Sequence, residues 1–515
     1  MINSIRSAMA CVLLSLTTFA FAQGPSDVAH YPLYKKISDS ATLLRMAEYL
    51  GNGESITMWE TILYGSSGAL VLVKSQGDTP KVKEVKIKND VQLGRGEIIT
   101  SAVYDRDVYV VYQLYSRDDE ELQLWLARIN TETLAIDSEE KLMTVGSYSK
   151  APKEIGYYNA AFSKDNSQLV VFGVSGSKEG KESAAYLQRF NLADNSGWTS
   201  DIRFDQSYSV IPALSELTPL SNNGAAITFR VVFPSNKRRV FKSIEYTAPH
   251  EYIVMVFDGE GKQSFSQVLE VENHLVSEVS LIEAKPGFIT VAGWVTESGS
   301  LSFDATYGST GAFSTVISLT DYAMKPFSVL EFGRDLLGKN RDTPLSSINN
   351  VQGYLSLTTL GRERASDGSA YIMAEERYGW SQGDYTAYRG EDAVVAKVSP
   401  EGSLEWVAKL ATRSSGYGEK AAFMHNDRLH VVFEDFTSNE SILDGGFANL
   451  GKDKESVLAI GSFSSDGKPS KKHVYNYGND KKRAYYGWFV GLVDGGIAQI
   501  TANQGLHYLE YVKLP

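Results

Sequence analysis

The chain has 515 residues, and its 50 lysines and arginines against 62 aspartates and glutamates give a net charge of −12 at pH 7. An acidic surface repels nucleic acid and anionic lipid, so we expect no nucleic-acid partner. The only cysteine is Cys11, which excludes disulfides, cysteine-ligated zinc and thiol catalysis in the rest of the chain.

Residues 1–22 have the features of a secretory signal peptide. A single positive charge at Arg6 precedes an apolar run, and the small residues Ala20 and Ala22 fit a cleavage site. The run is shorter than the ~20 residues that a membrane-spanning helix needs. We therefore expect an exported protein, periplasmic or extracellular, with no integral membrane segment after cleavage.

The next segment, residues 23–55, contains a pattern typical of a short amphipathic helix. The stretch SDSATLLRMAEYLG begins at Ser38, a residue type that caps helices, and ends at Gly51. Its apolar residues would share one side of the helix: Leu43, Leu44, Ala47 and Leu50. We expect an N-terminal extension with this helix, followed by one domain over residues 56–515.

Two kinds of β-hairpin alternate through that domain, and each occurs seven times. One kind is exemplified by ALVLVKSQGDTPKVKEVKIK from Ala69. The other has an Asn, Asp or Gly turn followed by an apolar, β-branched strand, as in DRDVYVVYQLY from Asp105. Pairing them gives seven four-stranded sheets, which is typical of a β-propeller. Six and eight blades are the alternatives.

The order of the hairpins predicts how the ring closes. The first repeated hairpin supplies strands three and four of a sheet, whereas the last supplies strands one and two. We expect residues 496–514 to join residues 69–88 in one blade, which would pair the exposed sheet edges. The strand GWFVGLVDG from Gly487 is an alternative first strand for this blade. Deleting residues 505–515 should destabilise the whole domain.

The stretch GEDAVVAKVSPEGSLEWVAKL, over residues 390–410, resembles the SBBP-type repeats of bacterial secreted β-propellers. That pattern has a Gly-x-Asp-Ala opening, an apolar strand ending in Lys, a Gly-containing turn and a strand with an aromatic residue. The matching residues are Gly390, Asp392, Ala393, Lys397, Gly402 and Trp406. A stretch from Gly293 is similar but looser, with Gly311 and Phe313 at equivalent places. The resemblance implies the propeller fold and assigns no functional residue.

Four consecutive blades have long predicted connections between their second and third strands. These connections span residues 234–251, 296–311, 361–392 and 437–456. Connections of this length are usually functional or disordered, and in a propeller they emerge side by side on one face. We expect a raised crescent there. Tyr, Trp and Arg dominate binding hot spots, and the ligand-binding candidates are Arg377, Tyr378, Trp380, Asp384, Tyr385, Tyr388, Arg389, Arg238 and Tyr307.

No catalytic or metal-binding signature accompanies the repeats. There is no Gly-x-Ser-x-Gly elbow and no Gly-rich phosphate loop, and the only close histidine pair, His425 and His430, flanks a turn. We expect no metal and no cofactor. The sequence favours an exported binding or scaffolding module for a protein or a cell-envelope ligand such as a surface glycan. It leaves open a carbohydrate-active enzyme, a glycoside hydrolase or lyase, with carboxylates from the same face: Asp304, Asp384 and Glu375. It also leaves open that the aromatic residues only pack the long connections onto the ring.

Overall fold

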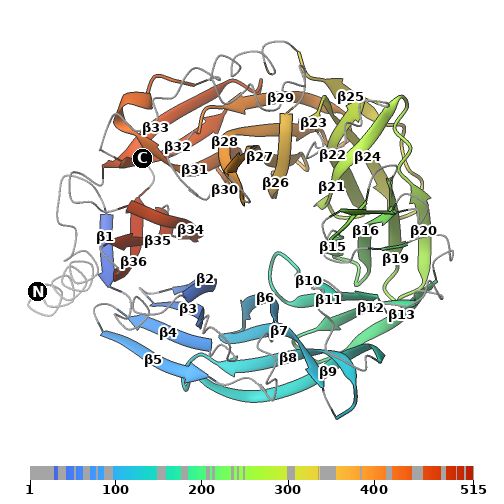
Figure 1. Cartoon of the computed structure of the whole chain (residues 1–515), viewed down its shortest axis with the longest axis horizontal. Helices are drawn as coiled ribbons and strands as arrows, with labels where there is room; N and C mark the ends of the chain where they lie inside the picture. The colour runs from blue at the N-terminus through green and yellow to red at the C-terminus, as the bar shows by residue number, and fades with distance from the viewer. Residues whose placement is uncertain are drawn as a thin grey trace, which may run out of the picture.

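The computed structural model shows a ring of β-sheets (Figure 1). It describes residues 28–32, 42–51, 54–61, 70–76, 79–85, 97–116, 118–147, 158–174, 184–203, 209–210, 215–232, 237–240, 243–246, 250–297, 308–333, 336, 355–382, 385–412, 420–443, 456–476, 483–493, 496–503 and 506–513. Over these ranges, no helix has the length and apolar character needed to cross a membrane. The expected signal peptide, residues 1–22, lies outside the described ranges.

Within the described residues, eight antiparallel sheets of four or five strands follow one another around the ring, and we number them as blades 1 to 8 in chain order. Blade 1 contains β2 (Thr42–Gly51), β3 (Glu54–Thr61), β4 (Leu70–Gln76) and β5 (Thr79–Val85). Blade 2 contains β6 (Glu97–Tyr104), β7 (Asp107–Ser116), β8 (Glu121–Asn130) and β9 (Ala135–Ser147). Blade 3 contains β10 (Tyr158–Phe162), β11 (Gln168–Val174), β12 (Ala184–Asn191) and β13 (Gly197–Arg203).

The middle blades carry additional short strands. Blade 4 contains β14 (Ser209–Val210), β15 (Glu216–Pro219), β16 (Ala225–Val232), β19 (His250–Phe257) and β20 (Gln263–Val268). A separate hairpin, β17 (Lys237–Val240) and β18 (Ser243–Tyr246), is inserted between β16 and β19. Blade 5 contains β21 (His274–Lys285), β22 (Phe288–Glu297), β24 (Gly311–Ser318) and β25 (Ser328–Glu331). Blade 6 contains β23 (Gly308–Ser309), β26 (Leu355–Arg364), β27 (Ala370–Gln382), β28 (Tyr385–Val398) and β29 (Leu404–Leu410).

The last two blades lead back to the start of the chain. Blade 7 contains β30 (Ala421–His425), β31 (Arg428–Phe436), β32 (Ser456–Phe463) and β33 (Pro469–Asn476), with a short 3-10 helix at Thr437–Asn439. Blade 8 contains β34 (Arg483–Val493), β35 (Gly496–Asn503), β36 (Leu506–Lys513) and the N-terminal β1 (Val28–Pro32). Figure 1 shows β1 beside β36.

The ring is closed by strands from both ends of the chain. The inner strands β2, β6, β10, β15, β21, β26, β30 and β34 contact each other in turn, and β34 contacts β2. In blade 8, β1 pairs with β36 from Val28↔Val512 to Pro32↔Tyr508. The predicted all-β propeller, closed by both termini, is therefore confirmed. The described residues form eight blades, one of the alternatives that the hairpin pattern allowed.

The expected helix near the N-terminus is wrong over Thr42–Gly51. This segment is β2, which pairs with β3 from Thr42↔Thr61 to Gly51↔Glu54. Met46 and Leu50 pack in the apolar cluster between blades 1 and 2. Pairing with a neighbouring strand and burial of alternate side chains outweigh the helix propensity of Leu, Met and Ala. The first part of the expected helix, residues 38–41, lies outside the described ranges.

The expected closing partners also need correction. Residues 70–85 pair within blade 1 as β4 and β5, because β2 and β3 supply the first two strands of that sheet. Gly487 lies in β34, the first strand of blade 8, so the alternative register is the right one. The last strand, β36, is consequently third in its blade, and β1 is fourth. The helix interpretation replaces β2 and leaves β3 without its hairpin partner, so the hairpin count gives one blade fewer than the structure has.

The described core lies between blades. Six apolar clusters each join two successive sheets, from blades 1 and 2 through to blades 6 and 7. Phe172 of blade 3 and Phe229 of blade 4 illustrate the contact, because both are fully buried and their rings stack 5.9 Å apart. Burying such a side chain contributes about 2–3 kcal/mol. One sheet alone cannot bury both of its faces, so the ring is the stable unit.

Tryptophans on fourth strands connect some neighbouring blades. Trp406, in the stretch with the SBBP-like pattern, stacks 5.8 Å from Phe463 of blade 7 and donates its indole N–H to the Ser465 carbonyl at 2.9 Å. Gly467 lies against this indole with φ +81°, so a Cβ there would lie only 2.7 Å from the Trp406 ring. Trp198 of blade 3 repeats the arrangement on Phe257 of blade 4, at 6.1 Å.

Candidate functional site

The two ends of the ring carry different kinds of connection. Because successive strands of a blade are antiparallel, the links from second to third strands all emerge at one end. We call this the hairpin end, since it carries β17–β18 and the tip of β27–β28. The turns from first to second strands, such as residues 163–167 and 365–369, emerge at the opposite end, which we call the pocket end.

The longest predicted connection, residues 361–392, is a pair of strands rather than a loop. β26 is the first strand of blade 6, whereas the sequence pattern predicts the second strand of a blade directly before residue 361. The actual second strand, β27, starts at Ala370 and pairs with β28 as far as Gln382↔Tyr385. The interpretation fails because Arg, Tyr and Gly interrupt the apolar alternation on which it depends. The sequence signal for a hairpin is the Gly383-Asp384 dipeptide, a type common in tight turns.

Part of this strand pair extends beyond its sheet. β26 pairs with β27 only as far as Leu357↔Glu376, and β29 pairs with β28 only from Ala393↔Leu410. Over residues 377–390 the two strands therefore pair with each other alone. We call this segment the hairpin extension. The register places Tyr378 opposite Arg389 and Trp380 opposite Ala387.

Most of the predicted ligand-binding residues lie on described backbone at the hairpin end. The hairpin extension carries Arg377, Tyr378, Trp380, Tyr385, Tyr388 and Arg389. Arg238 lies on β17, opposite Glu245. Asp384, Tyr307 and the further candidate Asp304 lie outside the described residues.

The base of the hairpin extension is held by buried ion pairs. Glu375, the last candidate carboxylate for the enzyme alternative, is 7% exposed and pairs with Lys420, which precedes blade 7. Its neighbour Glu376 accepts from Lys409 at 2.6 Å, and Lys409 also lies 3.5 Å from Asp392. A buried carboxylate held by an ammonium group is a structural anchor. It is not placed to receive a substrate.

Blade 7 has a comparable buried cluster around Asp435. Its carboxylate lies 2.8 Å from Lys471 Nζ and 3.2 Å from His473 Nε2, and it accepts from Asn439 at 3.0 Å. Burial alone would raise the pKa of Asp435, but His473, Lys471 and Asn439 together hold the pKa below its ordinary value. Asp435 is therefore ionised and fixes the end of β31 at the hairpin end of the ring.

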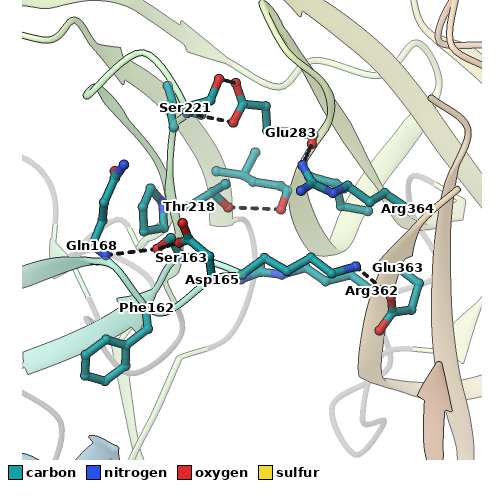
Figure 2. A pocket seen from close by; sticks show the side chains of 15 residues that line it. Phe162, Ser163, Asp165, Gln168, Thr218, Ser221, Glu283, Arg362, Glu363 and Arg364 are labelled. Atoms are coloured by element: carbon teal, nitrogen blue, oxygen red, sulfur yellow. Dashed lines mark hydrogen bonds and ion pairs between the residues drawn. The ribbon is translucent and has the colours of Figure 1, made fainter. Parts of the chain in front are cut away.

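A pocket of about 560 Å³ lies at the opposite end, where blades 3 to 6 face the channel. Figure 2 shows Glu363 and Arg364 on one side of it and Ser163 and Asp165 on the other. Its lining includes Phe162, Ser163, Lys164, Asp165, Gln168, Thr218, Ser221, Glu283, Arg362, Glu363 and Arg364. None of these is among the residues predicted to bind, because each belongs to an ordinary turn or strand end and they meet only when the ring forms.

Two ion pairs link non-neighbouring blades across this pocket. Arg362 of blade 6 pairs with Glu216 of blade 4 and also donates to the Leu217 carbonyl at 3.1 Å. Lys164 Nζ of blade 3 lies 3.6 Å from Glu363 Oε2 of blade 6. The second contact is longer than a hydrogen bond, and the Lys164 side chain is 62% exposed. Lys164 is therefore held weakly.

The other two carboxylates of the pocket lining accept short hydrogen bonds from serine residues. Glu283 accepts from Ser221 N at 2.8 Å and from Ser221 Oγ at 2.6 Å. Asp165 accepts from Ser163 Oγ at 2.6 Å and Ser167 Oγ at 2.8 Å, and the Ser163 bond is the main reason that the pKa of Asp165 is lowered. These bonds fix the turns that form the pocket walls.

Burial affects two glutamates in this region. It raises the pKa of Glu216, although Arg362 acts in the opposite direction. It also raises the pKa of Glu363, against a weaker opposing effect of Lys164. Both carboxylates thus retain a proton more readily than an exposed glutamate does.

The described residues show no metal centre. No group of three or more His, Cys, Asp or Glu side chains among them is arranged to hold an ion. The rings of His425 and His430 lie 5.9 Å apart at their centroids, and His430 Nδ1 is hydrogen-bonded to Ser462 Oγ at 2.8 Å. This pair has a packing role in blade 7.

Comparison with known proteins assigns neither a family nor a function. No family model matches the chain, and no curated protein matches its sequence. Among solved structures, the Dos1 propeller aligns at 9% identity with a TM-score of 0.44, and the alignment covers 93% of this chain and 94% of the Dos1 chain. The polysaccharide lyase Uly1 aligns at 11% identity and 0.39, covering 81% and 89%. The β-propeller domain of the Trilobed protease from Pyrococcus furiosus aligns at 9% and 0.35, covering 85% and 98%. We draw no functional conclusion from likenesses of this strength.

Proposed function

We propose that this protein is an exported β-propeller that binds a protein or a cell-envelope ligand through its hairpin end. In this proposal, residues 390–410 are an SBBP-type repeat of a bacterial secreted protein. The observation that supports it best is the hairpin extension, residues 377–390, which continues past the rest of the blade 6 sheet. Elements that extend beyond a rigid scaffold are where binding residues concentrate.

Composition and anchoring support this choice. The extension is rich in Tyr, Trp and Arg, the residue types that most often carry binding energy. Its base is tied to blade 7 through Glu375 and Lys420. A binding element held in place loses less conformational entropy when a partner docks. The second hairpin, β17–β18, brings Arg238 to the same end of the ring from blade 4.

The enzyme alternative has less support. Glycoside hydrolysis needs two carboxyl groups facing a common cavity. Of its three candidates, only Glu375 is described, and that side chain is buried against Lys420. A carbohydrate-active enzyme is therefore our second candidate function, and we propose no reaction at the hairpin end.

Pull-down from the native cell envelope tests the proposed function. One variant replaces residues 378–389 with an Asn-Gly turn, and a matched variant shortens β17–β18 to the same kind of turn. We expect the first change to abolish recovery of the specific partner and the second to reduce it, with melting temperatures within a few degrees of wild type. Recovery of the same partners by all three proteins would show that the hairpin end is not the binding face.

A further inference from the structure

The pocket end offers a binding site that is separate from the proposed hairpin-end function. The pocket volume of about 560 Å³ lies within the usual range for small-ligand sites, roughly 300–1,000 Å³. Its walls come from four blades and are fixed by the Ser221–Glu283 and Ser163–Asp165 hydrogen bonds. The cavity is therefore formed before any ligand arrives.

Three cationic side chains line this pocket, and they differ in how firmly they are held. Arg362 has two partners on β15, Glu216 and the Leu217 carbonyl, so its guanidinium is committed. Arg364 donates from Nη1 to the Glu283 carbonyl at 3.0 Å, its only hydrogen-bond partner among the described residues. Among the described residues, Lys164 has only the 3.6 Å contact with Glu363. Arg364 and Lys164 thus retain N–H groups that a ligand can use.

The acidic residues of the lining leave these N–H groups accessible. Asp165 and Glu283 keep their negative charge, but their oxygens accept from serine donors and form no ion pair with Arg364 or Lys164 among the described residues. Only Glu363 competes for a free cation, and it does so through a long contact with an exposed lysine. A ligand oxyanion at hydrogen-bond distance would form a stronger pair with Lys164 than the present one.

We propose that the pocket binds a small ligand carrying a carboxylate or phosphate group, which is held between Arg364 and Lys164. The planar guanidinium of Arg364 has further N–H donors that fit the two oxygens of such a group. The Glu283 carbonyl accepts from Nη1 and so orients this guanidinium. Lys164 exchanges Glu363 for the ligand. The hydroxyl groups of Thr218 and Ser163 line the space beside the anion.

Isothermal titration calorimetry on the full mature chain tests this site. The probes are inorganic phosphate, succinate and glucuronate, with glucose as the neutral reference. We expect saturable binding of at least one anion and none of glucose. Stronger binding of phosphate than of both carboxylates would identify a phosphate ligand, and the reverse order would identify a carboxylate ligand.

Variants assign the binding to the named residues. Arg364→Ala should weaken affinity roughly tenfold or more, as expected for loss of a charge-assisted hydrogen bond, and Lys164→Ala should weaken it less. Glu363→Gln should tighten binding, because the ligand then no longer competes with a carboxylate for Lys164. The control is Lys325→Ala, since Lys325 is an exposed lysine that bonds the Glu401 carbonyl and does not line the pocket. Absence of saturable anion binding to folded wild type, or unchanged affinity in both Arg364→Ala and Lys164→Ala, would overturn the proposal.

Discussion

Individual residues in this ring combine turn geometry with contacts between blades. Asp105 and Arg106 both adopt positive φ, at 45° and 65°, as the tight turn between β6 and β7 requires. Asn426 and Asp427 do the same in blade 7, at 49° and 55°. These turns are predictable because Asn and Asp tolerate the left-handed region. The indole contacts of Trp198 and Trp406 are not predictable, since each partner belongs to the next blade.

Glu48 gives a pH dependence that belongs to a single residue. It lies on β2, the inner strand of blade 1, where burial raises its pKa from 4.5 to about 7. The folded protein therefore binds a proton that the unfolded chain releases between about pH 4.5 and 7, so stability falls as pH rises through that window. The shift corresponds to a loss of up to about 3 kcal/mol above pH 7.

The change Glu48→Gln should remove this loss. We expect the variant to have a higher free energy of unfolding than wild type at pH 8 and nearly the same value at pH 4.5. Urea titration at the two pH values measures both. The same change at the exposed Glu260 provides the control. A wild-type protein whose stability does not fall between pH 4.5 and 8 relative to Glu48→Gln would contradict the assignment.

At the scale of elements, strands were predictable where a turn signal preceded a β-branched apolar run. β7, β11, β16, β22 and β31 all follow this rule and are second strands of their blades. β2 and β27 break it: β2 is rich in helix-forming residues, and β27 contains Arg, Tyr and Gly in its outer half. In both, pairing with a neighbouring strand decides the conformation.

The two candidate sites also differ in how far the sequence could predict them. The hairpin end could be located from sequence because its residues are consecutive and unusually aromatic. The pocket end could not, since Lys164, Ser221, Glu283 and Arg364 come from four blades and each has an ordinary local role. Only closure of the ring brings them to one cavity. No local sequence pattern predicts that cavity.

For the whole molecule, we expect stability to depend on closure of blade 8. Five N-terminal residues pair with β36, and β34 contacts β2, so the two ends of the chain hold each other. The six described apolar clusters carry the packing from blade 1 to blade 7, and the contacts of β34 with β30 and β2 complete the ring. The stability of every blade should therefore depend on a strand that contributes few contacts of its own.

A chain that begins at Leu33, and therefore lacks Val28–Pro32, tests that dependence. The change removes the backbone ladder to β36 and the fourth strand of blade 8. With about 1 kcal/mol for each net hydrogen bond, we expect a loss of roughly 3 kcal/mol in a single cooperative transition. Thermal unfolding followed by circular dichroism measures it. An unchanged melting temperature would show that β1 does not close the ring.

Site-specific photo-crosslinking tests the proposal that partners bind at the hairpin end. A photoreactive phenylalanine derivative is placed at Trp380 or Tyr388 on the hairpin extension. The control position is Val329, an exposed apolar residue on β25 that is 38% accessible. We expect the same partner adduct from both extension positions and none from Val329. Adducts of equal yield from Val329, or adducts from Val329 alone, would contradict the claim.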